Sequence, residues 1–242
     1  MDKVILITGA SSDMGCDLIR KIHGSYSRIW AHYHSFSDEL EKLQSEIGEK
    51  IRLLPCDFCS ADDIRQIIRQ IDESGDIPNQ IVHFAAPKTF NRQFHKCCWE
   101  DYQKGIDTSL RSITILLGHY IPLMRKQRYG RIVFLLTSYL IGTPPKFQSP
   151  YITVKYALYG LMKNLAAEYA DKGITVNGVS PDLVETKFLD LVPELIIRQN
   201  AEKSPIKRNL RPDDVTPAVK YLLSDEAEAV TGANIGITGG VR

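Results

Sequence analysis

The chain lacks the features that would direct it to a membrane, to an anionic partner or into a disulfide-bonded scaffold. No stretch of its 242 residues approaches the roughly 20 apolar residues of a membrane span, and its first residues resemble no signal peptide. Its 30 basic residues balance 29 acidic ones, so charge gives no reason to expect nucleic acid or a membrane as a partner. Five cysteines, an odd number, fit a reducing compartment better than a disulfide framework. We therefore expect a cytoplasmic protein.

The cysteines also lack a metal-binding arrangement. Cys56 and Cys59 form a C-x-x-C motif, and Cys97 and Cys98 are adjacent. A second C-x-x-C motif is missing, and adjacent side chains point apart in regular structure. These cysteines therefore indicate packing thiols, and we expect no metal site.

Short branched apolar runs alternate with longer amphipathic runs along the chain. This alternation predicts an α/β fold of the Rossmann type, a doubly wound parallel sheet of about seven strands with helices on both faces. The predicted strands cover residues 4–7, 28–33, 51–54, 80–84, 132–136, 175–179 and 234–238, and the predicted helices cover residues 14–23, 38–47, 61–71, 107–126, 151–171 and 212–223.

Residues 1–242 are predicted to form one domain, because the chain has the size of a single α/β domain and contains no repeat, low-complexity tract or linker. The one long irregular span, about residues 181–209, follows the sixth predicted strand. Long loops in compact domains are usually functional, so we predict a substrate lid there, with a plain crossover insertion as the alternative.

Two Tyr-x-x-x-Lys pairs occur, one at Tyr151 and Lys155 and the other at Tyr159 and Lys163. Residues at this spacing share a helix face, so either pair could bring a phenol to an ammonium. Pro150 suits a helix start, which places Tyr151 in the first turn, beside the loop that leaves the preceding strand. Ligands of open parallel sheets bind outside the carboxyl ends of the strands, so only the first pair lies near the crevice. We therefore predict that the first pair is catalytic and that the second belongs to packing and surface.

The first predicted strand ends in a glycine turn, T-G-A-S-S-D-M-G at positions 8–15, which opens a helix. A tight turn at a helix N-terminus offers backbone N–H groups and a positive dipole end to a pyrophosphate. The turn resembles the T-G-x-x-x-G-x-G signature of the short-chain dehydrogenase/reductase family. Asp57, Ser138, the Tyr151 pair and Ser180-Pro181 match the same family in order and spacing. The resemblance covers essentially the whole chain and extends to 3-oxoacyl-acyl-carrier-protein reductase-like members.

This resemblance implies an NAD(P)-dependent oxidoreductase acting on CH–OH or C=O groups. Tyr151 would be the general acid that protonates the substrate oxygen as hydride arrives. Lys155 would lower the pKa of that phenol and hold the nicotinamide ribose. Ser138 would donate a hydrogen bond to the carbonyl oxygen where charge develops. Ser109 occupies the position of an asparagine that in the family holds a water of a proton relay.

The resemblance also implies a set of nucleotide-binding residues. Within this set, the glycine turn would line the phosphates, Asp57 would bind adenine, and Val184 with Thr186 would meet the nicotinamide carboxamide. The full set is Gly9, Ser11, Ser12, Met14, Gly15, Tyr33, His34, Ser35, Asp57, Phe58, Ala85, Tyr151, Lys155, Pro181, Val184 and Thr186.

The chain departs from the family pattern at four places. Asp13 replaces a glycine of the turn, and its carboxylate is expected to face away from the phosphates. H-F-A-A at positions 83–86 replaces N-N-A-G; His83 is either a satisfied core residue, the commoner case, or a new catalytic base. Asp182 follows Pro181 where glycine is usual. Ser109 replaces the relay asparagine, so we expect slowed or rerouted proton transfer.

The end of the second predicted strand bears on the choice of cofactor. An acidic side chain there would hold the 2′-hydroxyl of NAD and repel the 2′-phosphate of NADP. Tyr33 is predicted to occupy the place of that acid, and His34 with Ser35 can donate to a phosphate. The sequence therefore favours NADP (NADPH) over NAD, although no arginine stands there.

The sequence gives little information about the substrate. Arg125, Lys126, Arg128 and Lys172 match positions where 3-oxoacyl-acyl-carrier-protein reductases carry basic residues for the carrier, but basic residues at helix ends are also ordinary dipole partners. The leading function is an NADPH-dependent carbonyl reductase acting on a ketone or a 3-oxoacyl-type substrate, small or carrier-linked. The alternatives are an NAD-dependent alcohol or polyol dehydrogenase and a catalytically weak dinucleotide-binding regulatory protein.

Family members form dimers and tetramers through the helices equivalent to residues 107–126 and 151–171. We therefore expect a homo-oligomer, a homotetramer by resemblance, with each apolar patch paired to its own copy. The candidate contacts are Leu116, Leu117, Leu161 and Leu165. The alternative for each is burial within its own chain, since every helix on a sheet has an apolar stripe.

Overall fold

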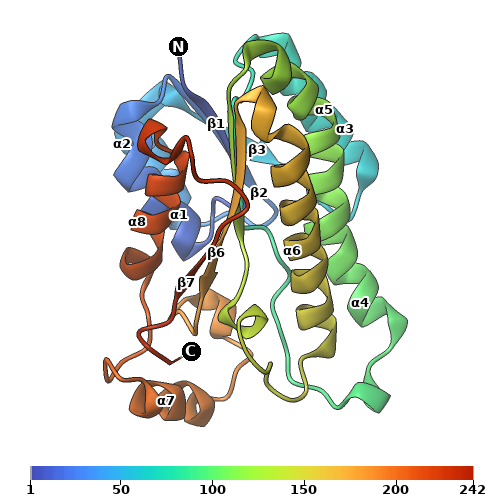
Figure 1. The fold of residues 1–242 in the computed structure, drawn as a ribbon, viewed down its shortest axis with the longest axis vertical. Helices are drawn as coiled ribbons and strands as arrows, with labels where there is room; N and C mark the ends of the chain where they lie inside the picture. The colour runs from blue at the N-terminus through green and yellow to red at the C-terminus, as the bar shows by residue number, and fades with distance from the viewer. Residues whose placement is uncertain (1, 242) are drawn as a thin grey trace.

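The computed structural model describes residues 2–241, which form a seven-stranded parallel sheet between two layers of helices (Figure 1). The strand order is β3-β2-β1-β4-β5-β6-β7, and each neighbouring pair is parallel. This arrangement confirms the predicted doubly wound sheet. The strands are β1 (Val4–Thr8), β2 (Arg28–Tyr33), β3 (Ile51–Pro55), β4 (Gln80–His83), β5 (Gly130–Leu135), β6 (Ile174–Pro181) and β7 (Asn234–Ile237).

The helices divide between the two faces of the sheet. In Figure 1, α1, α2 and α8 lie on one side of the strands, and α3, α4, α5 and α6 lie on the other. Each side has its own cluster of buried apolar side chains. The helices are α1 (Asp13–Ile22), α2 (Asp38–Ile47), α3 (Ala61–Ser74), α4 (Trp99–Gly105), α5 (Ser112–Gln127), α6 (Ser149–Tyr169), α7 (Glu194–Lys203) and α8 (Pro212–Leu223).

Local chemistry explains where these elements begin and end. All five residues of β1 are buried, and its sequence V-I-L-I-T is the nearly continuous apolar run expected of a central strand in a parallel sheet. The side chains of Ser12, Ser37 and Ser60 accept backbone N–H groups at the starts of α1, α2 and α3. Gly75, with φ of 79°, ends α3 in the left-handed conformation.

Two segments differ from the sequence-based expectation. The helix predicted to start at residue 107 begins with α4 at Trp99 and passes through a π-helical segment, Ile106–Arg111, into α5. Its start is capped by Asp101, whose carboxylate accepts the backbone N–H of Cys98 at 3.0 Å. The span predicted to be irregular contains α7, which begins after Pro193 without a side-chain cap.

The predicted oligomer contacts need correction. Leu116 and Leu117 are 0% and 2% exposed within the chain, where they pack in the core under α5. Leu161 and Leu165 are partly buried against the same core. Intrachain burial therefore accounts for the first two leucines, and only the α6 pair retains surface for a second copy.

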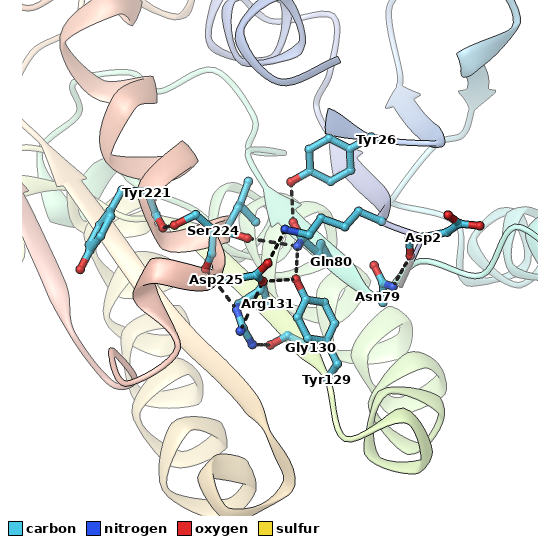
Figure 2. Close-up of polar contacts among 12 residues, drawn as sticks. Asp2, Tyr26, Asn79, Gln80, Tyr129, Gly130, Arg131, Tyr221, Ser224 and Asp225 are labelled. Atoms are coloured by element: carbon cyan, nitrogen blue, oxygen red, sulfur yellow. Dashed lines mark hydrogen bonds and ion pairs between the residues drawn. The ribbon is translucent and has the colours of Figure 1, made fainter. Parts of the chain in front are cut away.

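A polar network closes the amino ends of the central strands (Figure 2). Gln80, the first residue of β4, accepts a hydrogen bond from the Tyr26 phenol at 2.5 Å and donates to the Tyr129 phenol at 2.7 Å. Tyr129 in turn donates to Asp225 at 3.1 Å, and Arg131 stacks on its ring. These bonds pair the polar side chains at the amino edge of the sheet with one another.

Among residues 2–241 we find no helix that is both long and apolar enough to cross a bilayer.

Candidate active site

A cleft of about 730 Å³ opens at the carboxyl ends of the strands. Its size falls in the usual range for small-molecule and cofactor sites, and its position is the one expected for an open parallel sheet. Most of the predicted site residues line it: Gly9, Ser11, Ser12, Met14, His34, Ser35, Asp57, Phe58, Ala85, Tyr151, Lys155, Pro181, Val184 and Thr186.

Four predicted site residues do not line this cleft, all of them within the described part of the chain. Gly15 and Tyr33 lie behind its wall, Ser138 lies beneath its surface, and Ser109 lines a smaller cavity nearby.

The glycine turn brings backbone N–H groups to the cleft. Gly9 has φ of 69°, and a Cβ built there would lie 3.0 Å from the backbone nitrogen of Ala85, so only glycine fits between β1 and β4. A Cβ at Gly15 would lie 2.6 Å from the Cα of Ala10, so Gly15 serves the close packing of α1 against the turn. The N-terminus of α1 thus faces the cleft with a positive dipole end, which suits a pyrophosphate.

Asp13, which replaces a glycine of the family pattern, makes a hydrogen bond with a distant segment of the chain. Its carboxylate accepts the backbone N–H of Lys187 at 2.8 Å, and Lys187 begins a 3-10 turn in the segment after β6. Across the cleft, the Lys88 ammonium pairs with Asp190 of the same segment at 2.7 Å. The segment is therefore tied to both walls of the cleft.

One residue of the cleft, His32, was not predicted from the sequence, and it lies beside the glycine turn. The Nδ1 atom of His32 accepts the N–H of Gly9 at 3.1 Å, and its Nε2 atom donates to the Cys56 carbonyl at 3.2 Å. Burial lowers the pKa of His32 to about 4, so the ring is neutral, as this bonding requires. The ring stacks on Phe58 with centroids 3.7 Å apart, and both side chains line the cleft.

Tyr33 is a correction to the predicted cofactor residues. Successive side chains of a strand point to opposite faces, so His32 and His34 reach the cleft while Tyr33 points away from it. Tyr33 packs against the core under α1 and α2, with its ring 5.2 Å from that of Phe36. The residues at the cleft in this region are His34, Ser35 and Phe36.

The Tyr151 pair lies at the start of α6, as predicted, and both side chains line the cleft. The Lys155 ammonium donates to the carbonyl of Leu135 at 2.6 Å and lies 5.6 Å from the centroid of the Tyr151 ring. Burial lowers the pKa of Lys155 to about 8. Burial also raises the pKa of the Tyr151 phenol, against a smaller opposing effect of a hydrogen bond with Thr137. The expected lowering of that pKa by Lys155 is therefore not found in this structure, where desolvation sets the direction of the shift.

Ser138 is fully buried, and its hydroxyl donates to the Asp182 carboxylate at 2.9 Å. The neighbouring Thr137 lines the cleft instead. The sequence predicted that Ser138 lies just after the fifth strand. It did not predict the hydrogen bond of Ser138 with Asp182, which lies 44 residues away in the chain.

Ser109 lies in the π-helical segment and donates to the carbonyl of Ala85 at 3.0 Å. Together with Tyr151, Lys155 and Thr89, it lines a cavity of about 40 Å³, large enough for one ordered water. The structure thus brings Ser109 near the catalytic pair, with its own proton committed to the backbone.

His83 is a core residue. It is 2% exposed, and its Nδ1 atom pairs with the Thr8 hydroxyl at 2.8 Å. Burial lowers its pKa to about 3, so the ring stays neutral and holds the ends of β1 and β4 together.

The basic residues considered for a carrier lie away from the cleft. Arg125, Lys126 and Arg128 stand just before β5, and Lys172 stands just before β6, so all four lie at the amino edge of the sheet. Arg128 donates to the carbonyl of Asp171, as expected for a residue at a helix end. The lysines that line the cleft are Lys88, Lys104, Lys155 and Lys187.

The cysteines remain unpaired thiols, two of them buried. No cluster of metal-binding side chains occurs in the part of the chain that the structure describes.

Comparison with known proteins agrees with the fold. A family described as enoyl-(acyl carrier protein) reductase matches residues 9–242. The 3-oxoacyl-acyl-carrier-protein reductase FabG of Rickettsia conorii is 30% identical over 99% of this chain and 96% of its own length. The acetoacetyl-CoA reductase of Allochromatium vinosum is 26% identical over 100% of this chain and 99% of its own.

Solved structures share the fold along the whole length. Levodione reductase superposes with a TM-score of 0.90 at 22% identity, covering 99% of this chain and 97% of its own. ElxO with NADP bound superposes with a TM-score of 0.87 at 23% identity, covering 100% of this chain and 99% of its own. The chain belongs to the short-chain dehydrogenase/reductase family of NAD(P)-dependent oxidoreductases.

Proposed function

We propose that this protein is an NADPH-dependent carbonyl reductase whose substrate is a 3-oxoacyl thioester. The observation that carries the proposal is the Tyr151 pair at one end of a cleft whose other end is the glycine turn at the N-terminus of α1. Relatives named as 3-oxoacyl-acyl-carrier-protein reductase and acetoacetyl-CoA reductase support the substrate class.

The residues of the cleft fit a dinucleotide. The glycine turn lies along the cleft at the N-terminus of α1, which favours a pyrophosphate, and Asp57 lines the same cleft, where it is placed to bind an adenine. His34 and Ser35 line the cleft where a 2′-phosphate would lie, and this favours NADPH. Bound NADPH supplies the hydride.

The remaining chemistry belongs to the chain. Tyr151 gives its phenol proton to the carbonyl oxygen of the substrate, and Lys155 stabilises the phenolate that this leaves. With a pKa of about 8, Lys155 is mostly protonated at neutral pH and can pass a proton on. Water in the cavity beside Ser109 can then restore the proton of Lys155.

The segment after β6, residues 182–211, serves as a lid over the substrate. Its side chains Phe188, Leu189, Val192 and Ile196 give the cleft an apolar lining, and Phe188 lies 6.2 Å from Tyr151 between ring centroids. An acyl chain fits such a lining. Lys88, Lys104 and Lys187 at the same cleft can pair with the phosphates that carrier-linked and coenzyme A thioesters bear.

One observation favours a second candidate, a catalytically weak dinucleotide-binding protein. Ser138, the serine expected to bind the substrate oxygen, instead donates to Asp182. A protein of this kind would bind the nucleotide with little turnover.

Nucleotide titration followed by turnover separates the two candidates. We expect the intrinsic fluorescence to report tighter binding of NADPH than of NADH, and acetoacetyl-CoA to be reduced with loss of absorbance at the nicotinamide band. Tyr151→Phe should abolish turnover and retain nucleotide binding, whereas Tyr159→Phe should retain both. Tight NADPH binding without turnover of acetoacetyl-CoA or of a panel of ketones would favour the second candidate.

A further inference from the structure

The hydroxyl of Ser138 is committed to a carboxylate beneath the cleft. Its Oγ atom donates to Asp182 Oδ1 at 2.9 Å, and the two residues are 0% and 8% exposed. A serine hydroxyl has a single proton, and a hydrogen bond to a carboxylate is about twice as strong as one between neutral groups. A substrate oxygen, a neutral acceptor, would therefore have to compete with Asp182 for this proton.

Asp182 is held in a position that favours this bond. It directly follows β6, and its backbone N–H donates to the carbonyl of Ile237 in β7 at 2.9 Å, so the sheet fixes its backbone. Its side chain spans from the end of β6 to the segment that follows β5. A glycine here, as the family pattern has it, would leave the Ser138 hydroxyl without this acceptor.

Thr137, the residue before Ser138, differs from it in that Thr137 lines the cleft. Thr137 is 4% exposed, and it is one of the groups that act on the pKa of the Tyr151 phenol. Its Oγ1 atom also accepts the N–H of Tyr139 at 3.4 Å. Because that contact uses a lone pair, it does not consume the Thr137 proton.

We propose that Asp182 is a positioning residue that withdraws Ser138 from catalysis, and that Thr137 is the catalytic hydroxyl that works beside Tyr151. This assignment rests on the proposed carbonyl reduction. In it, Thr137 donates to the oxygen that becomes negative as the carbonyl is reduced, while Tyr151 gives that oxygen its proton. Ser138 and Asp182 then support the floor of the cleft.

A double-variant cycle in thermal unfolding tests the Ser138–Asp182 hydrogen bond without substrate or nucleotide. The pair Ser138→Ala and Asp182→Gly should lower the melting temperature together by less than the sum of the single changes, because they remove the same bond. Ser138→Ala combined with Asp171→Ala, a change at an exposed residue, should be additive. Additive behaviour in the first cycle would overturn the proposal, whatever the activity of the protein.

Turnover of acetoacetyl-CoA then tests the roles. Thr137→Val should lower kcat about 100-fold, as loss of an oxyanion donor does, and Ser138→Ala less than about threefold. Adding Asp182→Gly to Thr137→Val should free Ser138 and restore at least about tenfold of the lost rate. This rescue should disappear when Ser138→Ala is also present. Asp182→Ala, which also removes the acceptor, serves if the glycine variant folds poorly.

The outcomes separate this inference from the proposed function. A full loss of rate in Ser138→Ala with little change in Thr137→Val would overturn the assignment of Thr137 as the catalytic hydroxyl. The proposed carbonyl reductase function would not be affected by that result. A wild-type protein that reduces neither acetoacetyl-CoA nor other ketones would overturn the proposed function, and the unfolding cycle would still decide whether Asp182 holds Ser138.

Discussion

The carboxylate of Asp13 accepts the backbone N–H of Lys187 at 2.8 Å, joining the glycine turn to the proposed lid across 174 residues of sequence. Asp13 stands where the family pattern has glycine, so this contact is specific to chains that carry an acceptor there. The first turn of α1 thereby caps the 3-10 turn Lys187–Leu189 of the lid. The negative charge that makes this contact also lies at the cleft that is proposed to take the pyrophosphate.

Removing that charge should tighten nucleotide binding and loosen the lid. For Asp13→Gly we expect the dissociation constant of NADPH to fall about threefold to tenfold, since repulsion of a phosphate at partly solvated distances is worth about 1 kcal/mol. The amides of residues 187–189 should exchange hydrogen faster. Asp190→Asn, which breaks the Lys88 pair on the other wall, is the matched control and should loosen the lid without tightening NADPH. Unchanged exchange in Asp13→Gly would show that the contact does not hold the lid.

Lys155 should destabilise the free protein. Burial lowers its pKa from 10.5 to about 8, so the unfolded chain binds this proton more tightly than the folded one. Below pH 8 the group is charged in both states, and the buried charge costs about 3 kcal/mol. As the pH rises from 8 toward 10.5, the folded state has lost the proton and this cost fades, so the contribution of Lys155 to stability improves with pH.

The variant Lys155→Met should therefore unfold at higher temperature than the wild type at pH 7, and this advantage should shrink between pH 8 and 10.5. Chemical unfolding at a series of pH values measures it. Lys163→Met, at an exposed lysine of the same helix, should show no such gain. A less stable methionine variant at pH 7 would mean that the bond from Lys155 to the Leu135 carbonyl outweighs the burial of its charge.

The fold was predictable because its signals are local. The alternation of apolar runs gives the layers, and α2 and α8 begin at residues 38 and 212 as predicted because Ser37 and Pro212 are ordinary helix-start residues. The missed helix starts have weaker signals. Cys98 and Pro193 stand at the caps of α4 and α7, where neither residue type is a preferred cap.

The sequence predicted the position of a site residue only where that residue lies close to the end of a strand. The position of Tyr151 follows from the end of β5 and the start of α6, and the structure has it at the cleft. Tyr33 was misplaced because a shift of one residue in a strand reverses the face of the side chain. The Ser138–Asp182 and Asp13–Lys187 bonds join distant segments, and no local pattern encodes such contacts.

Because Ser35, and not Tyr33, lines the cleft at the end of β2, Ser35 is the residue to change in a test of cofactor choice. An acid at the cleft, Ser35→Asp, should repel the 2′-phosphate and shift the ratio of NADPH to NADH affinity toward NADH by about tenfold. Fluorescence titration with both nucleotides measures this ratio. Ser45→Asp, which adds the same charge on the exposed side of α2, should leave the ratio unchanged. A ratio that stays fixed in Ser35→Asp would mean that the 2′-phosphate does not lie against the end of β2.

The cavity beside the catalytic pair gives different expectations for Ser109 and Thr89. The Ser109 proton goes to the Ala85 carbonyl, so Ser109→Ala should chiefly lower stability, by about 1 kcal/mol, with a small change in rate. Thr89 is 7% exposed, and its buried hydroxyl has no protein partner among residues 2–241. Because Thr89 lines both this cavity and the cleft, its hydroxyl is placed to hold a water that links Lys155 to the cleft.

Thr89→Val should therefore slow turnover several-fold, the effect of one lost hydrogen bond of about 1 kcal/mol to a relay water, and leave NADPH binding and thermal stability nearly unchanged. The solvent isotope effect on kcat should rise in this variant, because proton return to Lys155 becomes slower, and it should stay at the wild-type value in Ser109→Ala. Ser109→Asn, which restores the amide of the family pattern, should preserve or raise the rate. If Thr89→Val keeps the wild-type rate and isotope effect while Ser109→Ala lowers the rate and raises the isotope effect, the relay passes through Ser109, and the route by way of Thr89 is wrong.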